Sequence, residues 1–306
     1  MPRTSYSGLS RRAFLAASTG VWLSMTTRSS QARATGDPSL AFDDNALIAA
    51  THRVWRYDPL RGTRRELPSP GRVATLATHP NRPGRIVAGL ASGSVCISDD
   101  GGNGWESRAA GLPSAPVNAV TIAADDPDLI YAALRDDGLW KSEDSGRNWS
   151  FAMDRPWQNE AEHDPLALAS VALETGMGGI WIYAGTDAGL IRVPDCFCRW
   201  QAVQPGNAMD ALASGKAPPP EAPLPEGEPI HALAVMPSHP GTLYAALPSG
   251  LWTSSNGGVV WSQLADGAAT AIAVHPRDIG QMAAIIDGNL KLSRDGGASW
   301  AAPSAT

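Results

Sequence analysis

An eight-residue motif occurs four times along this chain of 306 residues. The first copy, SDDGGNGW, runs from Ser98 to Trp105, and the other copies begin at Ser142, Ser254 and Ser293. Each copy fits the pattern Ser-x-Asp/Asn-x-Gly-x-x-Trp. A motif that recurs in this way indicates a repeat architecture, because a catalytic centre needs only one copy of its residues.

The residue types of the motif suit a tight turn between two outer strands. A short acid or amide accepts hydrogen bonds from nearby backbone N–H groups, and glycine adopts the backbone angles that such a turn needs. Tryptophan supplies a large apolar surface for packing between neighbouring repeats. We therefore expect structural roles for Ser98, Asp100, Gly102, Trp105, Ser142, Asp144, Gly146, Trp149, Ser254, Asn256, Gly258, Trp261, Ser293, Asp295, Gly297 and Trp300, and for Asp195 and Trp200 of a degenerate fifth copy.

The sequence around each motif repeats as well. In residues 117–153, three apolar runs are separated by turn residues, and the motif leads into a fourth run. This order is typical of an antiparallel meander of four short strands. We count six such repeats of about 45 residues each, the first of them abbreviated, which predicts an all-β, six-bladed β-propeller. Residues 35–306 are expected to form this single domain.

The motif resembles the Asp-box, or BNR, repeat of sialidases, of other glycoside hydrolases and of several non-enzymatic propellers. The wider repeat, with YAAL and GLWKS before the motif at residues 131–134 and 138–142, is most similar to exported propellers of the photosystem II stability/assembly-factor type. This resemblance implies boxes that are structural and lie away from any active centre. It also implies an assembly role, and seven blades as the alternative to six.

Residues 1–34 are predicted to be an export signal of the twin-arginine type. Arg11 and Arg12 precede the apolar run 13–25, and small residues ending at Ala34 offer a cleavage site. An ordinary secretory signal with a chance arginine pair is the alternative. The apolar run is too short to span a bilayer stably, so we expect a periplasmic or extracellular protein without a transmembrane segment in its mature chain.

Charge restricts the classes of partner. Residues 1–34 hold five arginines and no acid, so the mature chain has 24 − 5 = 19 bases against 30 acids, a net charge of −11. Nucleic acids and anionic membranes repel such a protein. We therefore expect no nucleic-acid partner.

The sequence predicts no catalytic residues. A sialidase needs a Phe/Tyr-Arg-Ile-Pro motif before its first box, whereas the nearest string, IRVP at 191–194, follows two boxes. Other glycoside hydrolases need two carboxylates that face each other across a cleft. The scattered histidines have no metal-ligand spacing, so neither a metal nor another cofactor is expected. A glycoside hydrolase or a carbohydrate-binding propeller remains the alternative.

The face opposite the motif turns carries the candidate binding residues. Two insertions, 154–165 and 204–229, lead from an outer strand to the next inner strand and emerge there. Loops of this length in a compact fold are often functional. The candidates are the residues of the turns between second and third strands and one loop aromatic: Arg53, Asp136, Asp137, Asp187, Asp287 and Trp157. Ordinary turn chemistry is the alternative for the aspartates, and ordinary packing of its loop onto the propeller is the alternative for Trp157.

Three cysteines, Cys96, Cys196 and Cys198, leave at least one thiol unpaired. Cys196 and Cys198 flank one residue, and we interpret them as small buried residues of an extended segment in a degenerate repeat. A redox pair or a soft-metal site is the alternative.

The sequence as a whole favours an exported, non-catalytic binding or assembly scaffold. Its expected partner is a protein complex of the cell envelope or membrane, and a carbohydrate is the alternative ligand.

Overall fold

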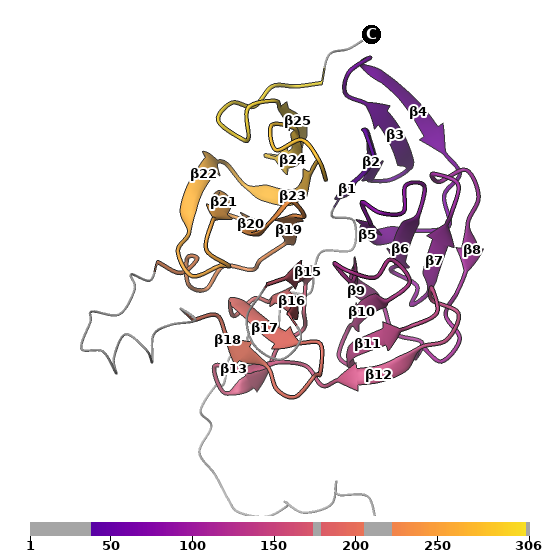
Figure 1. Cartoon of the computed structure of the whole chain (residues 1–306), viewed down its shortest axis with the longest axis vertical. Helices are drawn as coiled ribbons and strands as arrows, with labels where there is room; N and C mark the ends of the chain where they lie inside the picture. The colour runs from indigo at the N-terminus through magenta and orange to yellow at the C-terminus, as the bar shows by residue number, and fades with distance from the viewer. Residues whose placement is uncertain (1–37, 174–178, 205–221, 304–306) are drawn as a thin grey trace, which may run out of the picture.

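The computed structural model describes residues 38–173, 179–204 and 222–303. These residues form strands and no helix, and six antiparallel sheets surround a central axis as the blades of a propeller (Figure 1). The predicted all-β, six-bladed fold is confirmed, and the seven-bladed alternative is wrong. The predicted export signal, 1–34, and most of the second insertion lie outside the described residues.

Blades 1 to 3 have four strands each, numbered from the axis outwards. Blade 1 contains β1 (Ser39–Asp43), β2 (Ala46–Ala50), β3 (Val54–Asp58) and β4 (Thr63–Leu67). Blade 2 contains β5 (Val73–Thr78), β6 (Ile86–Leu90), β7 (Val95–Ser98) and β8 (Glu106–Ser107). Blade 3 contains β9 (Val117–Ile122), β10 (Ile130–Leu134), β11 (Gly138–Ser142) and β12 (Ser150–Met153).

A small hairpin separates blades 3 and 4, formed by β13 (Trp157–Gln158) and β14 (Ala161–Glu162). Blade 4 contains β15 (Ala167–Ala172), β16 (Ile180–Gly185), β17 (Leu190–Pro194) and β18 (Gln201–Ala202). Blade 5 contains β19 (Ala232–Met236), β20 (His239–Leu247), β21 (Gly250–Ser254) and β22 (Ser262–Asp266). Blade 6 contains β23 (Ala269–Val274), β24 (Met282–Ile286) and β25 (Asn289–Ser293), and a bridge from Leu292 to Ala301 takes the place of its fourth strand.

Apolar side chains fill the seams between neighbouring blades. Trp149 is the last residue of the eight-residue motif of blade 3, which we call a box, and it packs against Val87, Val95 and Ile97 of blade 2. Trp105, Trp200, Trp261 and Trp300 pack in the same way into four other seams. The tryptophans therefore join each of blades 2 to 6 to the preceding blade.

The seam between blades 6 and 1 closes the ring. Its cluster includes Phe42 and Tyr57 of blade 1 with Ile285 of blade 6, and among the described residues it contains no tryptophan. An ion pair from Arg277 to Asp44, with Nη1 3.1 Å from Oδ1, adds to this seam. Closure thus depends on side chains, because among the described residues neither blade shares a strand with the other.

Blade 1 is complete, although the sequence predicted an abbreviated repeat. Its outer strand β4 has four exposed residues out of five, so no apolar run marks it in the sequence. The turn before β4 lacks the box. Asp58 stabilises this turn instead, because Oδ1 of Asp58 accepts the backbone N–H groups of Leu60 at 2.9 Å and Arg61 at 3.0 Å.

Candidate functional site

Turns alternate between the two faces of the propeller, because each blade is an antiparallel meander. The boxes lie between third and fourth strands, on what we call the box face. The turns between second and third strands, and the connections between blades, lie on the opposite loop face. All six candidate binding residues belong to the loop face.

Hairpin β13–β14 stands on the loop face between blades 3 and 4. Its two turn residues, Asn159 and Glu160, have φ angles of 46° and 64°, the left-handed conformation that a two-residue hairpin needs. Trp157 pairs with Glu162 across the hairpin, and 68% of its surface is exposed. The indole of Trp157 is therefore mostly exposed to solvent.

Arg155 attaches the base of this hairpin to blade 3. Its guanidinium pairs with Asp136 at 3.3 Å, with Asp164 at 3.3 Å and with Glu162. Asp164 is buried, and that burial raises the pKa of its carboxyl. Its Oδ1 also accepts the backbone N–H of Asp136 at 3.0 Å, so the candidate turn and the insertion form one network.

His163 attaches the other side of the hairpin to blade 4. Its Nδ1 lies 2.6 Å from Oδ1 of Asp187, and its Nε2 lies 3.0 Å from the carbonyl oxygen of Gln158. The hydroxyl of Thr186 donates to Oε1 of Gln158 at 2.8 Å. Asp136, Trp157 and Asp187 are thus brought to one site through Arg155 and His163, which the sequence did not single out.

The other candidates have local partners. Asp137 accepts the indole N–H of Trp140 at 2.9 Å, within its own blade. Arg53 pairs with Glu66 at 2.8 Å on blade 1. Asp287 accepts the backbone N–H of Ala268 at 2.9 Å on blade 6. Ordinary turn and surface chemistry accounts for these three.

The four complete boxes share one hydrogen-bond pattern. In blade 3, Ser142 donates to Oδ1 of Asp144 at 2.9 Å and accepts the N–H of Gly146 at 2.8 Å. Asp144 Oδ1 accepts the N–H of Asn148 at 2.8 Å. The same three contacts recur in the boxes that begin at Ser98, Ser254 and Ser293.

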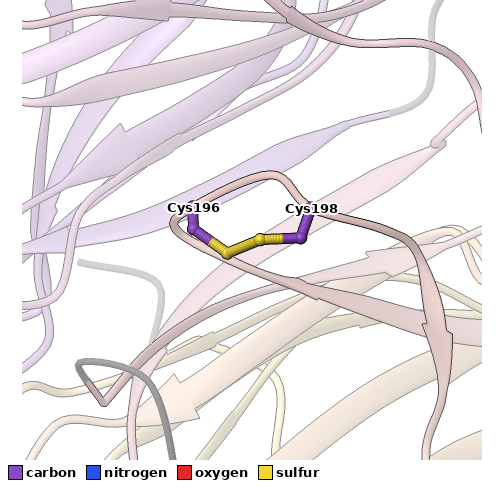
Figure 2. Close-up of a disulfide and its surroundings, with 2 residues drawn as sticks. All are labelled: Cys196 and Cys198. Atoms are coloured by element: carbon purple, nitrogen blue, oxygen red, sulfur yellow. A yellow bond between two sulfur atoms is a disulfide. The ribbon is translucent and has the colours of Figure 1, made fainter.

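The degenerate box of blade 4 contains a disulfide between Cys196 and Cys198 (Figure 2). Both cysteines are exposed, so the interpretation of them as small buried residues is wrong. The chain also turns here instead of continuing as an extended segment, since Phe197 has a φ of 51°. Trp200 keeps its place, and its indole N–H donates to the carbonyl oxygen of Asp154 at 2.8 Å.

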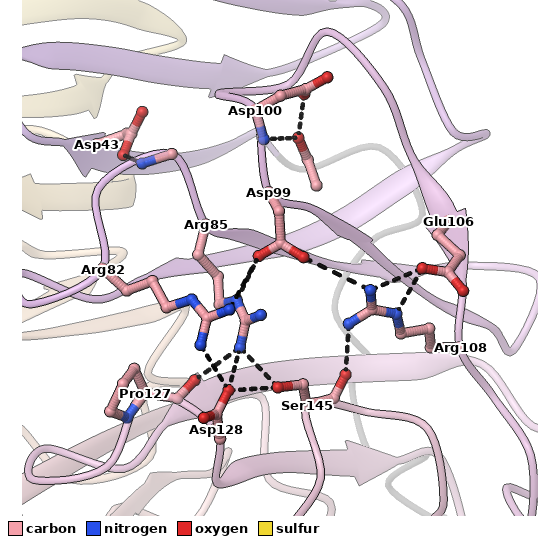
Figure 3. Close-up of polar contacts among 12 residues, drawn as sticks. Asp43, Arg82, Arg85, Asp99, Asp100, Glu106, Arg108, Pro127, Asp128 and Ser145 are labelled. Atoms are coloured by element: carbon pink, nitrogen blue, oxygen red, sulfur yellow. Dashed lines mark hydrogen bonds and ion pairs between the residues drawn. The ribbon is translucent and has the colours of Figure 1, made fainter.

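A polar network on the box face joins blades 2 and 3 (Figure 3). Arg85 is 2% exposed and donates to Asp99 at 2.8 Å and to Asp128 at 2.6 Å. Burial favours the protonated form of Asp99, but Arg85 and its neighbours Arg108 and Arg82 outweigh this effect and lower the pKa of Asp99. Because every guanidinium in this network has a carboxylate partner, the network is a structural link between blades.

The central cavity has a volume of about 200 Å³. The inner strands line it, together with His79 and the prolines that follow these strands on the box face. None of the lining residues, all within the described part of the chain, carries a carboxylate. This cavity therefore does not provide the opposed acids of a glycoside hydrolase.

The comparisons with known proteins show the fold. No family model and no curated protein matches the chain. A GH74 enzyme from Niastella koreensis superimposes with a TM-score of 0.58 at 15% identity, over 88% of this chain and 46% of that chain. The Cps50 (Swd1) β-propeller domain of Myceliophteria thermophila superimposes with a TM-score of 0.56 at 13% identity, over 85% of this chain and 97% of that domain.

A structure of YCF48 bound to a D1 peptide has a TM-score of 0.48 at 14% identity, over 84% of this chain and 78% of that chain. The chain spans about half the length of the GH74 enzyme from Niastella koreensis, because the match covers 46% of that enzyme's chain. At these identities the likeness identifies a β-propeller and nothing finer. Within the described residues, no helix has the length and apolar character needed to cross a membrane.

Proposed function

We propose that this chain is an exported, non-catalytic β-propeller that binds a partner protein of the cell envelope through hairpin β13–β14. The observation that carries the proposal is the exposed indole of Trp157 on a hairpin attached at both sides. An aromatic side chain held in place before binding loses little conformational entropy, and such residues often dominate binding energy. The four repeated turns are, in this proposal, Asp boxes that serve the scaffold.

The charges around Trp157 define the chemistry of the partner segment. The side chain of Asp136 is 73% exposed and that of Glu162 is 47% exposed, while Arg155 is directed to its carboxylate partners. Glu160 is also exposed at the hairpin turn. An acidic rim around an aromatic anchor suits a segment with one apolar residue and flanking lysines or arginines.

Site-specific crosslinking in the native envelope tests this proposal. A photoreactive residue replaces Trp157 in one full-length chain and Leu60 in a matched control. Leu60 is 69% exposed but lies on the box face. We expect one envelope protein to crosslink at position 157 and not at position 60. Equal crosslinking at both positions, or none at 157, would contradict the proposed site.

Binding of the purified protein then tests the role of the indole. We expect Trp157→Ala to weaken the complex at least tenfold, and Leu60→Ala to leave it unchanged. Melting temperatures of both variants should match the parent, because neither side chain is buried. A complex that survives Trp157→Ala would overturn the proposal.

Carbohydrate binding is the second candidate, because an exposed indole beside carboxylates also suits a sugar ring. Titration with neutral oligosaccharides, monitored by tryptophan fluorescence, distinguishes the two. Saturable quenching that Trp157→Ala abolishes, without any crosslinked protein, would replace the protein partner by a sugar.

A further inference from the structure

We propose that the disulfide between Cys196 and Cys198 is a thiol–disulfide exchange site that accepts two electrons from a protein dithiol. This inference is independent of the proposed function, because the cysteines lie at the box position of blade 4 and the hairpin lies on the loop face. The two Cα atoms are 5.4 Å apart, and a single residue separates the cysteines in the chain.

The bond contributes little to holding the propeller together. A disulfide stabilises mainly by restricting the unfolded chain, and this effect is smallest when the bridged residues are close in sequence. The strands on either side are already paired, since Ile191 faces Ala202 and Arg192 faces Gln201 in the β17–β18 ladder. The backbone N–H of Phe197 also donates to the carbonyl oxygen of Pro194 at 2.9 Å. The turn therefore has its own contacts without the bond.

The turn presents both cysteines to solvent. Phe197 is partly buried, and its ring lies 5.7 Å from that of the buried Tyr131. Cys196 and Cys198 on either side of it are exposed. Phe197 therefore anchors the turn on blade 3, while the disulfide remains accessible to a thiolate of another molecule. Exposed disulfides are the ones that exchange readily.

The third cysteine does not compete for this chemistry. Cys96 is 5% exposed in strand β7, and burial raises the pKa of its thiol. A buried thiol with a raised pKa is inert in exchange. The reactive set in the described part of the chain is thus Cys196 and Cys198.

The exchange proceeds in two displacements. A thiolate of the partner attacks Sγ of Cys196, the bond to Cys198 breaks, and Cys198 leaves as a thiolate that takes up a proton. The second partner thiol, after losing its proton, attacks the partner sulfur of the mixed disulfide and releases Cys196 as a thiolate, which is protonated. The partner dithiol is oxidised to a disulfide, and Cys196 and Cys198 are reduced to thiols.

The neighbouring charges set the order of these steps. Cys198 is followed by Arg199 and Cys196 is preceded by Asp195, and all four residues are exposed. A positive charge lowers a thiol pKa and a negative charge raises it, and the thiol with the lower pKa leaves faster. Cys198 is therefore the leaving group, and Cys196 forms the mixed disulfide.

The test incubates the folded, purified exported protein with a reduced peptide that contains two cysteines. Free thiols are then alkylated, and the products are identified by mass spectrometry. We expect one peptide oxidised per protein, both Cys196 and Cys198 alkylated, and a melting temperature that changes by less than about 2 °C on reduction. The same result is expected for Cys96→Ser, and no peptide oxidation for the Cys196→Ser/Cys198→Ser double variant.

Three outcomes would overturn the proposal. They are three free thiols in the untreated folded protein, reduction that occurs only together with unfolding, and peptide oxidation equal to that of the double variant. A separate measurement tests the direction of attack. The reduced Cys198→Ser variant should form a mixed disulfide between Cys196 and an oxidised peptide. This adduct should persist longer than any adduct that the reduced Cys196→Ser variant forms. The reverse order of lifetimes would assign the leaving group to Cys196.

Discussion

At the scale of single residues, the boxes show how a few hydrogen bonds define a turn. The side-chain amide and backbone N–H of Asn148 lower the pKa of Asp144 to about 2. The hydroxyl and backbone N–H of Ser299 lower the pKa of Asp295 to about 2 in the same way. Each contact is stronger to the ionised carboxylate than to the protonated acid, so protonation of the acid weakens the turn.

These shifts predict how stability responds to acid. Because the folded-state pKa lies below the ordinary value of about 3.9, the native state binds fewer protons than the unfolded state between pH about 4 and about 2. The stabilisation is complete above that window and is lost as the pH falls through it. We expect the free energy of unfolding to fall less steeply in this window for Asp144→Asn/Asp295→Asn, measured by urea unfolding at several pH values.

The chain offers a matched control for this experiment. Blade 5 has Asn256 at the acid position, and its Oδ1 accepts the N–H of Val260 at 2.9 Å. Asn256→Asp should therefore make the dependence on pH steeper. Identical slopes in the parent and both variants would contradict the role assigned to the box acids.

At the scale of blades, the seams hold both apolar clusters and the buried Arg85. Its guanidinium has two carboxylate partners, Asp99 and Asp128, whose side chains are 43% and 45% exposed. Ser145 accepts a further hydrogen bond from Arg85 at 2.8 Å and donates to Asp128. The buried cation keeps one carboxylate if the other is removed.

This arrangement predicts strong non-additivity. We expect Asp99→Ala and Asp128→Ala to lower the free energy of unfolding by about 1 kcal/mol each, since each leaves Arg85 paired. The double variant should cost at least about 3 kcal/mol, because it leaves a buried guanidinium without an anion. Urea unfolding measures the three values. Glu66→Ala, which breaks only the exposed pair with Arg53, is the control, and additive effects would disprove the network.

At the scale of the whole molecule, the ring closes where its first and last blades meet. Phe42 is 4% exposed in that seam, and its ring contacts His275 edge-on at 5.3 Å. Arg294 donates to the carbonyl oxygen of Pro59 at 2.9 Å, across the same seam. Within residues 38–173, 179–204 and 222–303, such contacts are what joins the first and last blades, so we expect the ring to open first at this seam.

Phe42→Ala tests closure. We expect a loss of about 3–5 kcal/mol, because the substitution leaves a cavity in the seam. Hydrogen exchange should accelerate in β1 and β23 while β10 and β16 stay protected. Phe151→Ala, at a position 47% exposed on β12, is the control and should change neither quantity. Uniform acceleration in all blades would show that the seam is not a separate weak point.

Much of the fold could be predicted because its signals are local. The box at Ser142 and the apolar runs around it repeat, and each repeat makes one blade. The outer strand β4 could not be predicted, because its residues are mostly polar and exposed and form no apolar run. The spacing of Cys196 and Cys198 indicates a redox pair as one alternative. Their exposure follows from a turn at Phe197, which no local sequence pattern predicts.

The candidate site was predicted only in outline. Asp136, Asp187 and Trp157 were chosen because they belong to turns and an insertion on one face. Arg155 and His163 bring them together, and those contacts join residues 19 and 24 positions apart in the sequence. Such pairs depend on how the hairpin lies between blades 3 and 4, which no single repeat determines.

The sequence by itself determined the all-β fold class and the structure of the boxes, because both follow from neighbouring residues within one repeat. The count of repeats predicted six blades. The tertiary structure alone decided which charges meet. Arg85 reaches Asp128 across 43 residues, and Arg277 reaches Asp44 across 233. The physical reason is that hydrogen bonds and packing along a strand act between near neighbours, whereas contacts between blades form only when the blades pack against one another.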